Sequence, residues 1–171
     1  MTISSRVTLS VFSFACLALA AKAAQLPSAA NTNAIITTFH AEGAQIYECK
    51  PDSSKPIGQA GTLVWQFREP IATLLADGQS VGRHYAGPSW ELVDGGGVKG
   101  KTIKNTPAPG PNDIPWLELE VVDHLGKGVL SEAVTVLRTN TKGGLAKGPC
   151  KTQGEYLSIP YSADYQFLRK S

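Results

Sequence analysis

Hydrophobic and polar positions alternate most clearly in residues 116–121 (WLELEV), where successive side chains fall on two different faces. One face carries Leu117, Leu119 and Val121, and the other carries Trp116, Glu118 and Glu120. A period of two with one apolar face is typical of a half-buried antiparallel strand. Residues 123–127 follow as a turn, and residues 133–138 (AVTVLR) have the composition of a partner strand.

Short segments of the same kind recur along the chain and are separated by turn residues. We expect strands at 45–49, 63–68 (stopped by Pro70), 71–76, 80–85, 89–93, 98–104 and 156–168 (interrupted at Pro160). Asp77-Gly78 is a hairpin signal, Gly95 to Gly97 is a further turn, and residues 106–115 are a proline-rich loop. No segment sustains a helical period. The pattern predicts a single-domain antiparallel β-sandwich or flattened β-barrel with long Gly/Pro loops.

The first 40 residues differ from this domain and divide into two parts. Arg6, the apolar run 11–20 and Ala21-Lys22-Ala23 have the order of a secretory leader, and the run is too short to span a bilayer. We therefore predict a signal peptide at 1–23, a flexible N-terminal arm at 24–40, and one all-β domain at 41–171. The mature protein is expected to be exported, periplasmic or extracellular, without a transmembrane segment.

Removal of the leader changes the charge and the cysteine count. The whole chain has 16 basic and 14 acidic residues, and loss of Arg6 and Lys22 leaves 14 of each. A neutral mature chain argues against nucleic acid as a partner, because phosphate binding needs a concentrated basic face. Cys16 belongs to the leader, so Cys49 and Cys150 remain. An even pair in an exported chain predicts one disulfide, and a thiolate metal site is the alternative.

Residues 95–102 (GGGVKGKT) match the string of a phosphate-binding loop, GxxxxGK[ST]. That motif works only when a helix leaves the loop, because the helix N-terminus and backbone N–H groups hold the phosphates. The residues that follow, Thr102 to Pro107, favour a strand and then a loop. We therefore expect a lysine-flanked hairpin turn and no nucleotide.

The segment 82–91 (GRHYAGPSWE) holds the candidate site. It places His84, Tyr85, Trp90 and Glu91 around a Gly-Pro break, and such breaks often mark places where a ligand approaches the backbone. A hairpin with a core Trp and a hydrogen-bonded His is the structural alternative. A metal held by His84 and His124 is a further possibility, but the spacing of the histidines predicts no cofactor.

Carboxylates and aromatics supply two weaker candidates. Glu118 and Glu120 have a spacing that could suit a pair of catalytic carboxylates, although their alternation with leucine is also typical of a solvated outer face. Five aromatics could line a carbohydrate or small-molecule groove or form the core; they are Trp65, Phe67, Tyr85, Trp90 and Trp116. Trp116 shares a face with the two glutamates, so we expect it to be partly exposed.

From residue 41 to the C-terminus the chain resembles the family catalogued as domain of unknown function 3455. The matching segments are 41–49 (AEGAQIYEC), 84–91 (HYAGPSWE), 114–117 (IPWL), 136–144 (VLRTNTKGG) with Cys150, and 161–165 (YSADY). The resemblance implies an exported protein of bacteria or fungi and assigns no catalytic residue. Some fungal members are labelled malate dehydrogenase, but this chain lacks the βαβ unit and the helix after Gly100 that a dinucleotide site needs.

Together these observations predict an exported, non-catalytic module that binds an unknown small molecule, a glycan or an envelope component. The alternative is a metal-dependent or carboxylate enzyme centred on His84 and Glu91.

Overall fold

A computed structural model describes residues 33–52, 54 and 62–171 of the chain. The predicted signal peptide lies outside the described residues, as does the part of the predicted arm before Asn33. Within the described ranges, no helix has the length and apolar character needed to span a bilayer.

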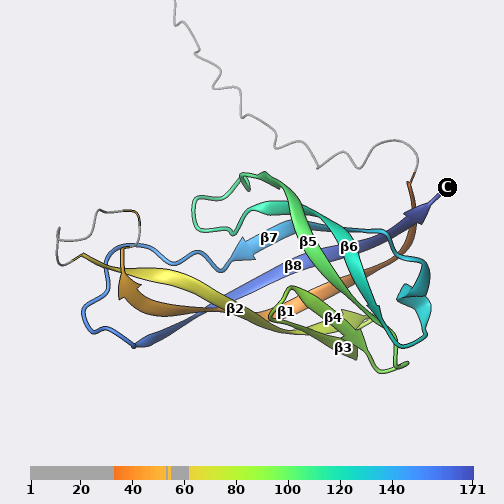
Figure 1. Ribbon diagram of the computed structural model, residues 1–171, viewed down its shortest axis with the longest axis horizontal. Helices are drawn as coiled ribbons and strands as arrows, with labels where there is room; N and C mark the ends of the chain where they lie inside the picture. Colours follow the sequence, from red (N-terminus) through yellow and green to blue (C-terminus); the bar gives the residue numbers. More distant parts are fainter. Residues whose placement is uncertain (1–32, 53, 55–61) are drawn as a thin grey trace, which may run out of the picture.

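Eight antiparallel strands form one sheet, and the last strand pairs with the first, so the sheet closes into a ring (Figure 1). The strands are β1 (Asn33–Pro51), β2 (Leu63–Ala76), β3 (Gln79–Tyr85), β4 (Ser89–Leu92), β5 (Gly97–Thr106), β6 (Trp116–Leu125), β7 (Thr135–Gly143) and β8 (Tyr156–Lys170). A short 3₁₀ turn, Val129–Glu132, connects β6 to β7. The prediction of an all-β antiparallel fold is confirmed, and the sheet is closed.

The first strand begins before the predicted domain boundary. Residues 33–40, assigned from sequence to a flexible arm, form the first part of β1 and pair with the end of β8, from Asn33 opposite Lys170 to His40 opposite Asp164. The prediction was wrong for these residues because the polar composition of 24–40 hid Ile35, Ile36 and Phe39. Only pairing with a strand more than 120 residues away shows that they belong to the sheet.

Pro70 and Pro160 lie inside strands, although a break in the strand was predicted from the sequence at each of them. Pro70 pairs with Gln45 inside β2, and Pro160 pairs with Ala44 inside β8. Each strand has lost its other neighbour at that point: β2 pairs with β3 only from Ala72 onward, and β7 stops opposite Tyr161. Proline lacks an N–H but is tolerated where one side of a strand has no partner or at a bulge.

Two of the predicted turns are present, whereas residues 123–125, predicted to begin a turn, are the end of β6. Asp77 and Gly78 join β2 to β3 with positive φ angles of 48° and 76°, the conformation of a two-residue hairpin turn. The string that resembles a phosphate-binding loop starts in the β4–β5 turn and continues along β5 from Gly97. A strand follows the glycines where a nucleotide site would need a helix.

The core lies inside the ring and consists mostly of side chains that alternate inward along the strands. Its largest fully buried members are Trp90, Tyr165, Phe167, Leu74 and Leu119. Leu117 and Val121 pack against this cluster at its edge, as the alternation of β6 predicts. Trp116, expected to be partly exposed, is only 7% exposed.

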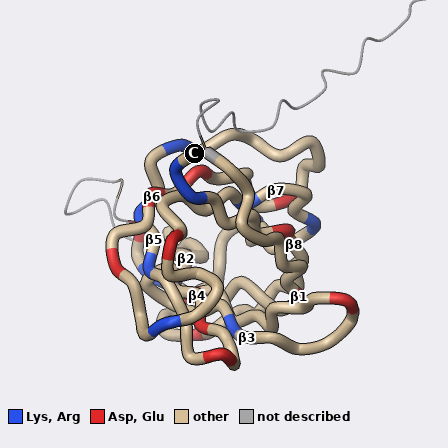
Figure 2. Tube along the Cα trace, turned by 90° about the vertical axis from the view of Figure 1, so that its right-hand side faces the viewer, with Lys and Arg blue, Asp and Glu red and all other residues tan. Residues whose placement is uncertain are grey.

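Charged residues of both signs are scattered around the ring in the view along its long axis (Figure 2). Six pairs of a Lys or Arg with an Asp or Glu form among the described residues. They include two lysines of the string that resembles a phosphate-binding loop, because Lys99 pairs with Asp123 at 3.4 Å and Lys101 pairs with Glu120 at 3.8 Å.

Candidate functional site

The β3–β4 hairpin divides the predicted site between two faces of the sheet. His84 and Trp90 are paired across the hairpin and point into the ring, where they are 2% and 1% exposed. Their rings stack with centroids 4.7 Å apart and planes inclined by 9°. Tyr85 and Glu91 are the next residues along each strand, so they point to the opposite face. The four residues therefore do not converge on one site.

His84 is held as a neutral core residue. Its Nδ1 atom donates a hydrogen bond to the Ser89 carbonyl oxygen at 2.8 Å. Burial lowers the pKa of His84 to about 4, although the bond to Ser89 acts in the opposite direction and the positive charge of Arg138 adds to the lowering. The imidazole is therefore uncharged at neutral pH.

On the outer face, Glu91 binds Arg83 and Tyr85. Glu91 Oε2 accepts hydrogen bonds from Arg83 Nη2 at 2.8 Å and from the Tyr85 hydroxyl at 3.2 Å. These two bonds, with the bond from Arg83 the stronger influence, lower the pKa of Glu91. Arg83 and Glu91 border an open depression over Gly82, but exposed ion pairs of this kind are common on sheet surfaces.

The two histidines proposed as metal ligands lie far apart in the sheet. His84 pairs with Trp90, Trp90 pairs with Val98, and Val98 pairs with His124. Three strand spacings, or about 14 Å at roughly 4.8 Å a spacing, separate their backbones along the sheet. Each ring also contacts a backbone carbonyl oxygen already, His84 that of Ser89 and His124 that of Ala133. The described residues contain no cluster of three or more His, Cys, Asp or Glu side chains suited to a metal.

Sequence reasoning missed a pocket where the wall of the ring is incomplete. β3 and β4 are short. On that side β2 therefore has no strand partner between its isolated bridge from Val64 to Pro149 and Ala72, and β5 has none in the ladder after Lys99. A cavity of about 290 Å³, the end pocket, lies between these two strands. Its lining comes from five strands and two loops: Gln45, Tyr47, Phe67, Thr102, Asn105, Ile114, Pro115, Leu117, Arg138 and Leu145.

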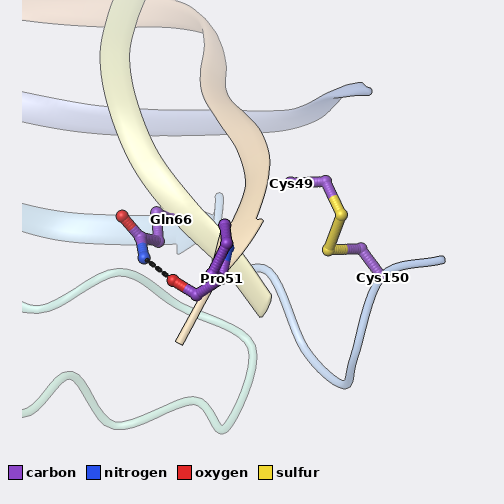
Figure 3. The surroundings of a disulfide bond; sticks show 4 residues. All are labelled: Cys49, Pro51, Gln66 and Cys150. Atoms are coloured by element: carbon purple, nitrogen blue, oxygen red, sulfur yellow. Dashed lines mark hydrogen bonds between the residues drawn. A yellow bond between two sulfur atoms is a disulfide. The ribbon is translucent and has the colours of Figure 1, made fainter. Parts of the chain in front are cut away.

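The disulfide predicted from sequence fastens the loop that forms one side of this pocket. Cys49 and Cys150 are bonded with their Cα atoms 5.8 Å apart (Figure 3). The bond joins the end of β1 to the segment that carries Leu145. Tyr47 reinforces the connection by donating a buried hydrogen bond of 2.7 Å to the Gly144 carbonyl oxygen. The pocket wall is therefore held on both sides of Leu145.

Arg138 brings a positive charge to the inner wall of the end pocket. It pairs with Leu117 on one side and Tyr165 on the other, and its Nε and Nη2 atoms both donate to the Pro115 carbonyl oxygen, at 3.0 and 2.8 Å. This positive charge affects the pKa of three nearby tyrosine hydroxyls. Burial raises the pKa of Tyr47, Tyr161 and Tyr165, and Arg138 acts in the opposite direction at each of them.

Gln45 adds an unsatisfied donor to the same pocket. Its side chain is 2% exposed, and its Nε2 atom has no hydrogen-bond partner within the described part of the chain. The amide lies near Tyr161 and lowers the pKa of that hydroxyl without completing a hydrogen bond. Three other buried polar atoms are also unpartnered, on Trp90, Trp116 and Thr139, and none of these residues lines the end pocket.

The lining of the end pocket is a mixture of apolar side chains and polar donors. It contains no His, Cys, Asp, Glu or Ser, so no side chain is available as a general base at neutral pH or as a carboxylate ligand. The Thr102 hydroxyl has no base beside it in the lining. Apolar side chains and amide, phenol and guanidinium donors together can hold a ligand and orient it.

Fold and site define an all-β protein with one closed antiparallel sheet and a pocket in its wall. A family model described as "Protein of unknown function (DUF3455)" matches residues 29–169, and the chain belongs to this family. No curated protein and no solved structure matches the chain. The match begins four residues before β1, which agrees with the early start of that strand.

Proposed function

We propose that this protein is an exported, non-catalytic binding protein that holds a small molecule in the end pocket. The observation that carries the proposal is made at Gln45, a residue of the pocket lining whose buried Nε2 atom has no partner among the described residues. An unsatisfied buried donor costs about 1–3 kcal/mol. A hydrogen-bond acceptor on a bound ligand would remove this cost.

The volume and the lining support the same function. About 290 Å³ is near the lower end of the range for small-molecule sites. Apolar contacts from Phe67, Leu117 and Leu145 would hold a ligand, and the polar groups would orient it. The Cys49–Cys150 disulfide supports export, because such bonds persist in oxidising compartments.

The experiment compares thermal unfolding of the wild type with that of two matched tryptophan variants. Asn105→Trp places a large ring at the mouth of the pocket, whereas Lys104→Trp changes the neighbouring exposed residue, which does not line the pocket. The panel contains monosaccharides, short fatty acids, aromatic acids and neutral aromatics. A ligand at 100 times its Kd stabilises by about 2.7 kcal/mol, which raises Tm by roughly 5 °C or more.

We expect at least one compound to raise the Tm of the wild type and of Lys104→Trp but not of Asn105→Trp. The proposal fails if no compound shifts the wild type, or if both tryptophan variants respond equally. Export is tested separately by N-terminal sequencing of the secreted or periplasmic protein, for which the predicted cleavage gives Ala24 as the first residue. Recovery of the uncleaved chain in the cytoplasm would contradict export.

A further inference from the structure

We propose that the end pocket selects ligands carrying a single carboxylate on a small apolar body, with Arg138 and Gln45 as the carboxylate-binding residues. This inference rests on the proposed function, since it names the class of ligand for the same pocket.

Arg138 differs from every other arginine in the described part of the chain. Arg68, Arg83 and Arg169 are exposed, and each pairs with a glutamate: Glu69, Glu91 and Glu132 respectively. Arg138 is the least exposed of the four and forms no ion pair.

The missing partner is not hidden in an undescribed segment. All 14 acidic residues of the chain lie within the described ranges, and none has a carboxylate oxygen within 4.0 Å of the Arg138 guanidinium. A partly buried guanidinium without a counter-charge is expensive unless something else supplies the charge. The sequence therefore provides a fixed cation at this pocket and leaves its anion to come from outside.

The hydrogen bonds of Arg138 leave donors for a ligand. Two of its five N–H groups are used by the single Pro115 carbonyl oxygen. That contact fixes the plane of the guanidinium from one edge. A third is directed at the Tyr165 hydroxyl, where its side-chain hydrogen bond helps to lower the pKa of that phenol. The remaining N–H groups have no partner within the described residues, and a planar fork of donors matches the two oxygens of a carboxylate.

Gln45 supplies a second donor and Asn105 a third. Gln45 is on β1 and Asn105 is on β5, so the amides approach the pocket from different strands than Arg138, which is on β7. Each amide also carries an acceptor oxygen, whereas Arg138 only donates and the lining has no carboxylate. The charge of Arg138 therefore favours an anionic ligand, which the amides can also contact.

The rest of the lining argues for one negative charge and an apolar body. Arg138 is the only cationic side chain of the ten lining residues, and half of the lining is apolar: Phe67, Ile114, Pro115, Leu117 and Leu145. A doubly charged phosphate would meet a single guanidinium and five apolar side chains. One carboxylate attached to a hydrocarbon chain or an aromatic ring satisfies both parts of the pocket.

The test uses benzoate and benzamide, which have nearly the same shape and differ in charge and in hydrogen-bonding character. Titration at pH 7.5, followed by amide chemical shifts, is expected to give at least tenfold tighter binding of benzoate. Phenyl phosphate is included as the doubly charged probe and is expected to bind more weakly than benzoate.

Two variants assign the effect to the pocket. In Arg138→Met, which keeps a long apolar side chain, we expect the preference for benzoate over benzamide to disappear while benzamide binding remains. Arg83→Met is the matched control, because Arg83 is paired and lies on the outer face. Gln45→Leu is expected to weaken benzoate binding several-fold, and this variant keeps the inference testable if Arg138→Met does not fold.

The outcomes separate the two proposals. Equal binding of benzoate and benzamide to the wild type overturns the carboxylate inference but leaves a small-molecule pocket in place. Preferential benzoate binding that survives in both Arg138→Met and Gln45→Leu also overturns it. If neither compound binds and the wider panel gives no shift that Asn105→Trp abolishes, the proposed function itself fails.

Discussion

The imidazole of His84 lies flat against the indole of Trp90, with ring centroids 4.7 Å apart, and both rings contact Tyr165 inside the sheet. The segment 82–91 therefore contributes two of its residues to an aromatic cluster inside the sheet. Its remaining polar residues, Tyr85 and Glu91, form a surface pair with Arg83.

The buried position of His84 predicts a stability loss in mild acid. Its pKa is lowered from 6.5 to about 4, so the unfolded chain takes up the proton first as the pH falls. The loss begins below pH 6.5, is about 2.5 kcal/mol at pH 4.5, and levels off below pH 4. The check is the free energy of unfolding in urea at pH 7 and pH 4.5 for the wild type and His84→Gln.

Other groups also titrate between pH 7 and pH 4.5. The test is therefore the difference between the wild type and His84→Gln in the unfolding free energy that each loses over this range. The wild type should lose about 2.5 kcal/mol more than His84→Gln between the two pH values. His40→Gln, at an exposed histidine, should behave like the wild type. Parallel losses in wild type and His84→Gln would show that His84 titrates normally.

The disulfide predicts a large effect of reduction. Cys49 and Cys150 are separated by 101 residues, so the bond restricts most of the unfolded chain. Replacing both cysteines with serine should lower the free energy of unfolding by about 4–5 kcal/mol in the chain-entropy model. Denaturation with and without reductant measures this loss, and reductant should not affect the double variant. A loss below about 1 kcal/mol would contradict this prediction.

The Tyr47 hydroxyl is predicted to stabilise the pocket wall. Tyr47→Phe removes the donor to Gly144 and leaves a buried carbonyl without that bond, at a cost of about 1–2 kcal/mol. Tyr156→Phe is the control, since Tyr156 is 58% exposed and should change stability by less than about 0.5 kcal/mol. Urea denaturation of both variants provides the comparison, and equal effects would argue against a role for the buried bond.

Close approach of β1 and β2 makes Gly43 sensitive to substitution. A Cβ atom there would overlap the Ile71 carbonyl oxygen and lie 2.5 Å from the Ala72 Cα atom, so the backbones would have to move apart. Gly43→Ala should destabilise by about 2 kcal/mol or more. A Cβ atom added at Gly78 would meet no atom within 4 Å, and only the φ of +76° disfavours alanine there. Gly78→Ala should therefore lower the free energy of unfolding by about 1 kcal/mol. The ranking of the two melting temperatures checks this.

Parts of the site could be read from the sequence, but their combination could not. Residues 133–138 place Arg138 on the same face as the apolar Val136, which is a recognisable signal of a cation pointing inward. Gln45 similarly shares a period of two with Tyr47 and Cys49, both of which are buried. The sequence could not show that these two residues lie at the same pocket, because β1 and β7 are not neighbours and are connected only through β8.

Alternation and turn chemistry determine the strands of this protein, because each depends on residues a few positions apart. The inward face of β6, the Asp77-Gly78 hairpin and the strand after Gly97 all follow from such local patterns. The tertiary structure decided three other matters: the early start of β1, the continuation of β2 through Pro70, and the gap beside β2 and β5 that opens the pocket. Each depends on which strand lies alongside and where that neighbour ends, and that is settled only when distant segments pair.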